Sequence, residues 1–189
     1  MVESIFITGL GGQGIVTLAS LITDLAADSG CRVSLFNAKG MAQRGGRVTA
    51  EIRYSGGKDD FFGPRIGIGE ADVMIGMELG EAASLQAMLR PQGLLLLADV
   101  ALAPAEVALK KQAYPDGAQV RGLFEDRTKR IVCAPPPARA RNLFMLGLLV
   151  SRTERFSAEN AEALIARRLT KGREAGLESF RQGYAYDGV

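Results

Sequence analysis

The sequence predicts a three-layer α/β fold with a mostly parallel, doubly wound (Rossmann-like) sheet and helices at its C-terminal end. Three observations predict it: apolar strand-like segments alternate with helical patterns, the first such segment ends in a glycine-rich turn, and the last 50 or so residues are helical in pattern. The chain has 189 residues, 47% of them hydrophobic and 23% charged, which is ordinary for one globular domain. We expect a single domain over residues 1–189, with an α/β core at 1–155 and a C-terminal helical segment at 156–189.

The first strand–helix–strand unit is predicted within the first 36 residues. Ser4–Thr8 is a β-branched and aromatic run that ends in glycines, as in a buried strand. Apolar residues then recur at helical spacing over 15–29, and Gly30 is a suitable helix stop. A second strand follows at 31–36, so we expect a right-handed crossover.

The later segments continue this alternation. Predicted buried strands lie at 72–77, 93–98 and 129–133, a short helix lies at 80–89, and longer helices lie at 142–152, 157–169 and 173–182. Ser157 is the predicted N-cap of the second long helix. The segment 47–54 differs because polar and apolar residues alternate, which indicates one wet or partner-facing side. We place it at a sheet edge or in a hairpin with the segment after Gly57.

Charge and composition exclude some locations and partners. The net charge of +2 is too small to indicate nucleic-acid binding, although residues 121–189 hold 13 Lys/Arg against 8 Asp/Glu. This basic third faces either solvent or an acidic or phosphate-rich partner. The apolar runs are far shorter than the roughly 20 residues that span a bilayer, and no signal peptide is evident at Met1. We expect a cytoplasmic protein without membrane contact.

A glycine-rich turn follows the first predicted strand. Residues 9–14 read Gly-Leu-Gly-Gly-Gln-Gly and fit the pattern G-x-G-x-x-G between a strand and a helix. Glycines allow positive φ angles and close backbone approach, and the first amides of the following helix attract negative charge. The sequence therefore predicts a phosphate or other anion site, whose candidate contacts are Gly9, Gly11, Gly12, Gln13 and Gly14. The alternative is a tight turn that serves only helix–strand packing.

The pattern narrows the class of phosphate compound. Ile15 and Val16 stand where an ATP-hydrolysing loop has Lys and Ser or Thr, so ATP hydrolysis is disfavoured. A dinucleotide site has an acidic residue after the second strand, but residues 36–39 read Phe-Asn-Ala-Lys. NAD is therefore disfavoured as well.

A second loop is rich in glycine and hydrogen-bond donors. Residues 39–47 read Lys-Gly-Met-Ala-Gln-Arg-Gly-Gly-Arg and follow the second predicted strand. In a doubly wound sheet this loop lies at the same carboxyl edge as the first glycine turn. Its candidate ligand contacts are Met41, Gln43, Arg44, Gly45 and Gly46. The alternative is a flexible surface loop with scattered charges.

Several catalytic arrangements are missing from the sequence. It contains no histidine, which excludes Ser-His and Cys-His pairs. Cys31 and Cys133 are its only cysteines, too few for an iron–sulfur cluster or a cysteine-based zinc site. Glu78 and Glu81 lie near a strand end, where they cap the next helix or bind a ligand. No Gly-Asp-Gly segment with a downstream Asn marks a magnesium–diphosphate site, so we predict no catalytic residue and no metal ligand in this chain.

The two loops together resemble one protein family. Gly9–Thr17 followed by Gly40–Gly46 is similar to the gamma subunit of 2-oxoacid:ferredoxin oxidoreductases, and closest to the small subunit of indolepyruvate ferredoxin oxidoreductase. Further similarity is found at 50–53, 70–73, Asn142, 146–147 and 177–183, and so extends over nearly the whole chain. Residues 113–128 match no part of the family pattern.

The resemblance implies an accessory subunit of a thiamine-dependent enzyme that is inactive alone. The implied reaction is oxidative decarboxylation of a 2-oxoacid (indolepyruvate-like, or pyruvate or 2-oxoglutarate) to an acyl-CoA, with electrons passed to ferredoxin. Coenzyme A would contact this chain at residues 11–14 and 43–46, whereas thiamine diphosphate, Mg²⁺ and [4Fe-4S] clusters would be held by partner subunits only. The implied partners are thiamine-binding and ferredoxin-like subunits, with ferredoxin contacted indirectly, and a homodimer of the isolated chain is left open.

Two other hypotheses remain at this point. The glycine turn is also compatible with a self-sufficient flavin- or nucleotide-binding reductase, against which the missing acid after the second strand counts. A purely structural subunit, whose glycine turn binds nothing, is the third hypothesis.

Overall fold

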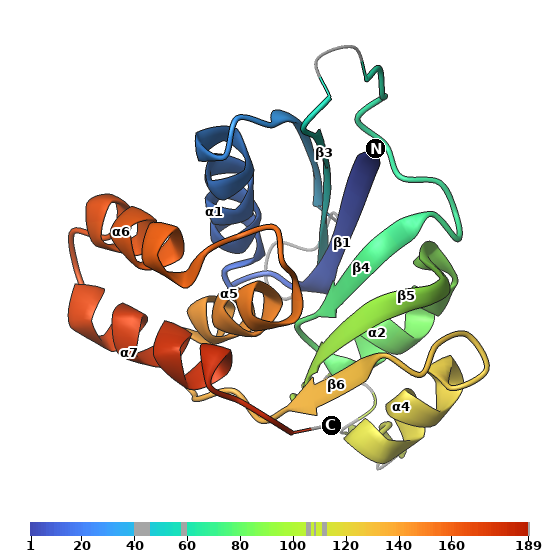
Figure 1. Ribbon diagram of the computed structural model, residues 1–189. Helices are drawn as coiled ribbons and strands as arrows, with labels where there is room; N and C mark the ends of the chain where they lie inside the picture. Colours follow the sequence, from blue (N-terminus) through green and yellow to red (C-terminus); the bar gives the residue numbers. More distant parts are fainter. Residues whose placement is uncertain (40–45, 58–59, 105–106, 108, 111–112, 189) are drawn as a thin grey trace.

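The computed structural model describes residues 1–39, 46–57, 60–104, 107, 109–110 and 113–188, and it shows a six-stranded mixed sheet between two layers of helices (Figure 1). The strand order is β2-β3-β1-β4-β5-β6. The strands are β1 (Val2–Leu10), β2 (Arg32–Lys39), β3 (Arg47–Ser55), β4 (Ala71–Gly76), β5 (Leu89–Ala98) and β6 (Ile131–Ala134). β1, β4, β5 and β6 pair in parallel, and β3 runs antiparallel to both of its neighbours. The predicted α/β fold is confirmed.

The helices divide between the two faces of the sheet. One face carries α1 (Ile15–Asp28), α5 (Arg141–Arg152), α6 (Ala158–Arg168) and α7 (Arg173–Tyr184), as Figure 1 shows. The other face carries α2 (Leu79–Ser84), the 3₁₀ turn η1 (Gln86–Met88) and α4 (Gly117–Phe124). Each face has its own hydrophobic core, and the core under α1 and α5 is the larger one. The predicted strands and long helices are confirmed with boundary shifts of a few residues.

The position predicted for β3 is wrong. β3 lies inside the sheet between β1 and β2, and its hairpin partner is β2, with Lys39 opposite Val48. The alternating pattern correctly indicates two different faces, because Ile52 and its apolar neighbours pack under α1 while Glu51 points to the other side. That polar side is covered by residues 60–70, which supply hydrogen-bond partners to Glu51 and Arg53. Because residues 60–70 satisfy the polar side chains of β3, this strand can lie in the middle of the sheet.

α4 was not predicted, although it falls within the unmatched segment 113–128. Asp116 and Gln119 form a reciprocal capping box at its start, with the Asp116 carboxylate accepting the Gln119 amide at 2.8 Å. Val120 and Phe124 are fully buried against the sheet. At the C-terminal end, Ser157 caps α6 as predicted, since its hydroxyl accepts the Asn160 amide at 3.1 Å.

α5 is apolar over most of its surface because it is packed between the sheet and α7. A Cβ at Gly147 would lie 2.0 Å from the Phe180 carbonyl oxygen, and a Cβ at Gly183 would lie 1.9 Å from the Phe144 carbonyl oxygen. The two glycines thus allow the helix backbones to touch. Among the helices of the described residues, none has the length and apolar character needed to cross a membrane.

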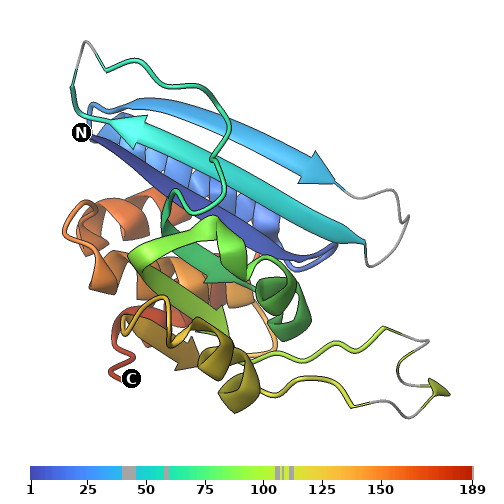
Figure 2. The same cartoon turned by 90° about the vertical axis from the view of Figure 1, so that its right-hand side faces the viewer.

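The sheet topology places the glycine turn at a switch point. The connection after β1 crosses to α1 on one face, whereas the connection after β4 leads to α2 on the other face (Figure 1). β1 and β4 are neighbours, so their carboxyl ends form the switch point, which is the position at which ligands bind in doubly wound folds. β2 ends and β3 begins on this same side of the molecule (Figure 2).

Candidate functional site

The glycine turn has the backbone geometry that its sequence predicts. Gly12 has φ +93° and Gly14 has φ +77°, conformations that side-chain-bearing residues adopt only at a cost. Gly14 is also the N-cap of α1, and no side chain caps this helix. Gly11 and Gly12 are exposed, so the turn faces solvent.

Only some of the turn's amides have a partner. The Gly11 amide donates to the Gly46 carbonyl at 2.9 Å, and the Gln13 amide donates to the Leu10 carbonyl at 3.2 Å. Within the described residues, the amides of Gly12, Gly14 and 15–17 have no acceptor. The first turn of α1 contains no acidic residue, and Val16 and Thr17 are exposed. This end of α1 is therefore electropositive and open to an anion.

The Gln13 side chain links the end of β1 to the residue that follows β4. Its side-chain oxygen accepts the Leu10 amide at 2.7 Å, and its side-chain nitrogen donates to the Met77 carbonyl at 2.9 Å. Gly9 lies beneath it, because a Cβ there would be 2.6 Å from the Gln13 oxygen. The structure thus gives Gly9 and Gln13 structural roles, and an anion would approach over Gly12 and the start of α1 instead.

The start of a second helix lies beside the turn. A Cβ at Gly14 would be 2.8 Å from the Asn142 side-chain nitrogen, so the first residues of α5 contact the N-cap of α1. α5 also begins after a residue with positive φ, Ala140, and has neither a capping side chain nor an acid in its first turn. At its first residue, Arg141, the Nε atom is buried without a partner in the described part of the chain. Two uncapped helix N-termini and an arginine thus adjoin, which adds positive potential.

Arg141 was not identified from the sequence. Asn142 was noted only as a family match and not as a neighbour of the glycine turn. The unusual αL conformation of Ala140, which directs the start of α5 toward α1, has no sequence signal. A basic residue at the start of an apolar helix was the only available indication.

The second predicted loop is partly described. Met41, Gln43, Arg44 and Gly45 lie outside the described residues, so their predicted role stays a prediction. Gly46 is placed beside the turn by the hydrogen bond from Gly11. The loop also leaves β2 and enters β3 at the end of the sheet where Leu10 pairs with Arg47.

The two glutamates after β4 serve the protein itself. Glu78 is fully buried and accepts three hydrogen bonds, from the Glu81 amide at 2.8 Å and from the Leu102 amide and Tyr114 hydroxyl at 3.0 Å each. Burial and the neighbouring Glu78 charge raise the pKa of Tyr114 to about 12. Glu81 forms an ion pair with Arg47 at the start of β3. Of the two roles predicted for Glu78, the structure supports helix capping.

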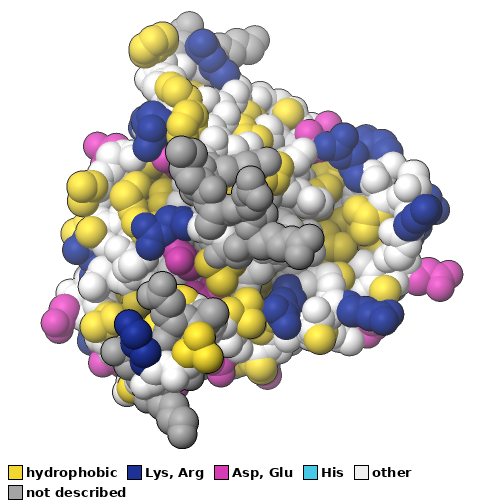
Figure 3. Space-filling view, turned by 180° about the vertical axis from the view of Figure 1, so that it is seen from behind, with side chains coloured by type: hydrophobic (Ala, Val, Ile, Leu, Met, Phe, Trp, Pro, Cys, Tyr) yellow, Lys and Arg dark blue, Asp and Glu magenta, His cyan; other side chains and the backbone are white. Residues whose placement is uncertain are grey.

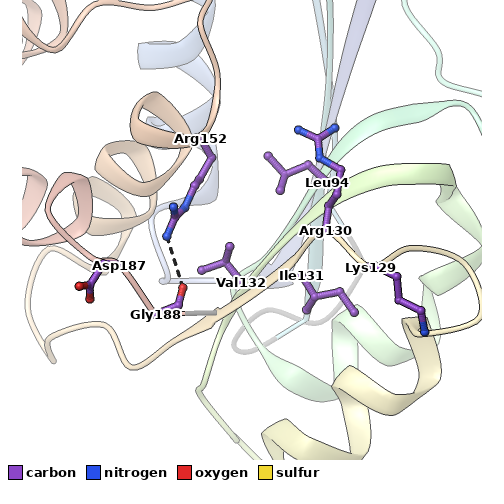
Figure 4. Close-up of a pocket in the computed structure, with 8 residues that line it drawn as sticks. All are labelled: Leu94, Lys129, Arg130, Ile131, Val132, Arg152, Asp187 and Gly188. Carbon is purple, nitrogen blue, oxygen red and sulfur yellow. Dashed lines mark hydrogen bonds between the residues drawn. The ribbon is translucent and has the colours of Figure 1, made fainter.

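A cavity of about 240 Å³ lies at the β6 edge of the sheet (Figure 4). Leu94, Ile131 and Val132 give it an apolar floor. The charged ends of Arg130, Lys129 and Arg152 point in different directions in Figure 4, and Arg152 donates to the Gly188 carbonyl at 3.3 Å. These charges do not converge on one ligand position, so the glycine turn remains the candidate site. The described residues contain no cluster of potential metal ligands.

Comparison with known proteins shows the family to which this chain belongs. The family model "Pyruvate ferredoxin/flavodoxin oxidoreductase" matches residues 4–186. The indolepyruvate oxidoreductase subunit IorB of Pyrococcus horikoshii is 33% identical over 123 residues, which are 65% of this chain and 59% of that relative's length. The matched stretch thus spans less than two thirds of this curated relative.

Two solved structures share the fold. The pyruvate oxidoreductase subunit PORC of Thermotoga maritima has a TM-score of 0.70 at 20% identity, with 97% of this chain and 95% of that chain covered. The 2-oxoglutarate:ferredoxin oxidoreductase of Magnetococcus marinus, solved with 2-oxoglutarate, coenzyme A and succinyl-CoA bound, has a TM-score of 0.70 at 18% identity. The alignment covers 97% of this chain but only 30% of that longer chain. From the extent of the family match, we conclude that this chain belongs to the pyruvate ferredoxin/flavodoxin oxidoreductase family.

Proposed function

We propose that this chain is the accessory, gamma-type subunit of a thiamine-dependent 2-oxoacid:ferredoxin oxidoreductase and that it helps to bind coenzyme A. The enzyme would decarboxylate a 2-oxoacid oxidatively, form an acyl-CoA and reduce ferredoxin. An indolepyruvate-like substrate is favoured over pyruvate and 2-oxoglutarate, since the curated relative with 33% identity is an indolepyruvate oxidoreductase subunit. The family match supports this class of reaction.

The observation that carries the coenzyme A proposal is the open amide group at the start of α1. Coenzyme A carries a diphosphate and a 3′-phosphate, and such groups bind to unpaired helix amides. The nearby start of α5, with Arg141, adds a second source of positive charge. No acidic residue occupies the first turn of either helix. The loop residues Gln43 and Arg44 are predicted to complete the site.

No site for the redox cofactors is evident in the part of the chain that the structure describes. Thiamine diphosphate requires a magnesium site, and the described residues offer no group of three potential metal ligands. Two half-buried free cysteines are also too few for a [4Fe-4S] cluster. We therefore assign these cofactors to partner subunits, and this chain contributes substrate binding and no chemical step. Alone, it would have no activity.

Reconstitution tests this proposal. The chain is combined with a large thiamine-binding subunit from the same organism, and ferredoxin reduction is measured with indolepyruvate, pyruvate or 2-oxoglutarate. We expect reduction that depends on coenzyme A and on the presence of this chain. Turnover by the chain alone, or an unchanged apparent KM for coenzyme A in a complex with Gly12→Ala, would contradict it.

A purely structural subunit is the second candidate. It is favoured by the Gln13 side chain, whose polar atoms are already bonded to Leu10 and Met77, and by the paired Gly11 amide. Calorimetric titration of the assembled complex with coenzyme A separates the two functions. Loss of coenzyme A binding in the Gly12→Ala complex supports the coenzyme A-binding subunit. Unaltered binding in that complex supports the purely structural subunit.

A further inference from the structure

One half of the sheet lacks a helix on the side opposite α1. Over β2, β3 and the start of β1, the segment 60–70 is what covers this side among the residues that the structure describes, and Figure 2 shows it crossing in front of the strands while α1 lies behind them. The segment is firmly attached. Glu51, 2% exposed, accepts the Ile66 amide at 2.6 Å and the Arg65 Nε at 3.0 Å, and the Ile66 side chain is buried in the smaller core.

This attached segment nevertheless presents large apolar side chains to solvent. Phe61 is 88% exposed and Ile68 is 80% exposed. An anchored segment has no need of such residues for its own stability. Both side chains lie on the same segment, and exposed apolar surface is a feature of interaction sites. In Figure 3, hydrophobic and basic side chains alternate over the upper part of the face seen from behind.

Arginines on this side of the sheet lie over aromatic rings. The Arg65 guanidinium lies 4.4 Å from the Phe36 ring centre, and Arg53 lies 5.9 Å from the Phe62 ring centre. Arg32, at the start of β2, is exposed and has no ion-pair partner among the residues described. The Glu51 carboxylate is buried beneath the segment, so its charge is not offered to a partner. Arginine and aromatic side chains are the types enriched at the centres of protein interfaces.

We infer that the surface formed by Phe61, Ile68, Arg32 and the Arg65–Phe36 pair is the docking site for the larger, thiamine-binding subunit, which would present an apolar socket with carboxylates around it. The partner's proposed charge follows from Arg32, which is exposed and has no ion-pair partner among the described residues. A large protein partner is chosen because the same fold occupies only 30% of the Magnetococcus marinus chain, where it is one part of a longer polypeptide. The identity of the partner rests on the proposed function.

The test uses the two-subunit complex, obtained by co-expression. Phe61→Ser with Ile68→Ser is the apolar variant, and Arg32→Glu is the charge variant. Leu123→Ser is the matched control, since Leu123 is 49% exposed on α4, near the opposite edge of the sheet. The dissociation constant between the subunits is measured by interferometry at two salt concentrations, and folding is checked by circular dichroism and melting temperature.

We expect the apolar variant to raise the dissociation constant at least 100-fold, at unchanged melting temperature. Arg32→Glu should raise it about tenfold at low salt and less at high salt, because screening weakens charge pairs. The control should bind like wild type. Wild-type binding by the apolar variant overturns the docking site, and so does a homodimer of the isolated chain that this variant disperses, because the occupant is then a second copy.

Failure of the two proposals can be told apart. If the wild-type chain binds the thiamine subunit and the variants bind equally well, the docking site is refuted and the proposed function stands. If the wild-type chain forms no complex with that subunit, both are refuted together.

Discussion

Gly12→Ala separates backbone strain from ligand binding. The residue has φ +93°, and a Cβ built on it meets no atom within 4 Å. The substitution therefore causes no clash, and its cost to folding is the left-handed backbone conformation, about 1–2 kcal/mol. Gly30→Ala is the matched control, because Gly30 has φ +76°, equally open surroundings and a position at the other end of α1. Both variants should lose the same stability in urea denaturation.

Their ligand affinities should differ. The added methyl group at position 12 stands where an anion would approach the free amides, each worth roughly 1.5–3 kcal/mol to a charged ligand. Loss of one such contact weakens coenzyme A binding about 10- to 100-fold. Isothermal titration of the assembled complex measures this, and desulfo-coenzyme A provides a non-reacting ligand. If Gly12→Ala and Gly30→Ala bind equally well, the turn takes no part in the site.

Three further substitutions test the structural roles of single residues. Glu78→Ala leaves three donors without their acceptor and should cost roughly 2–4 kcal/mol in urea denaturation, a loss below about 0.5 kcal/mol being incompatible with a structural role. Gly147→Ala forces a methyl group against the Phe180 carbonyl and should lower the free energy of unfolding by at least about 3 kcal/mol. Its control is Gly122→Ala on α4, which has open surroundings and should raise the free energy of unfolding by about 0.5–1 kcal/mol. Equal melting temperatures of the two variants would contradict the close α5–α7 contact. Burial, followed by the Glu3 charge, raises the pKa of Tyr54 well above its ordinary value of about 10. The free energy of unfolding therefore falls as the pH rises above about 10, because Tyr54 then ionises in the unfolded chain and stays neutral in the folded one. The stability of Tyr54→Phe should fall less steeply above pH 10, and parallel alkaline denaturation profiles would refute the assignment.

Much of the fold follows from local sequence signals. The run Ser4–Thr8, the apolar pattern of α5 and the cap at Ser157 each depend on neighbouring residues, and each is confirmed. The position of β3 was not predictable in this way. An alternating strand can have its polar side in water or under a loop, and the loop that covers it is held by hydrogen bonds to Glu51 across 14 and 15 residues. α4 had a local signal, the Asp116–Gln119 capping box, that was overlooked.

The candidate site, like the fold, was predictable from local sequence only in part. The positive φ angles of Gly12 and Gly14 were predictable, because glycine in a strand–turn–helix motif has few other uses. The bridge from Gln13 to Met77 and the contact between Gly14 and Asn142 join segments 64 and 128 residues apart in sequence. Such contacts follow from how α5 packs on α1, and a single sequence carries no spacing rule for them.

The two proposed binding regions lie toward opposite ends of the sheet, and this makes both possible in one complex. The docking surface follows the end of β3, where Ser55 pairs with Val2 at the start of β1, whereas the glycine turn follows the other end of β1. A subunit bound over Phe61 and Ile68 would leave the amides of α1 accessible to coenzyme A. The buried glutamates Glu51 and Glu78 accept hydrogen bonds from loops of this chain, at Ile66 and Leu102 respectively. Both carboxylates are buried, so neither projects into the space over the glycine turn or over the docking surface.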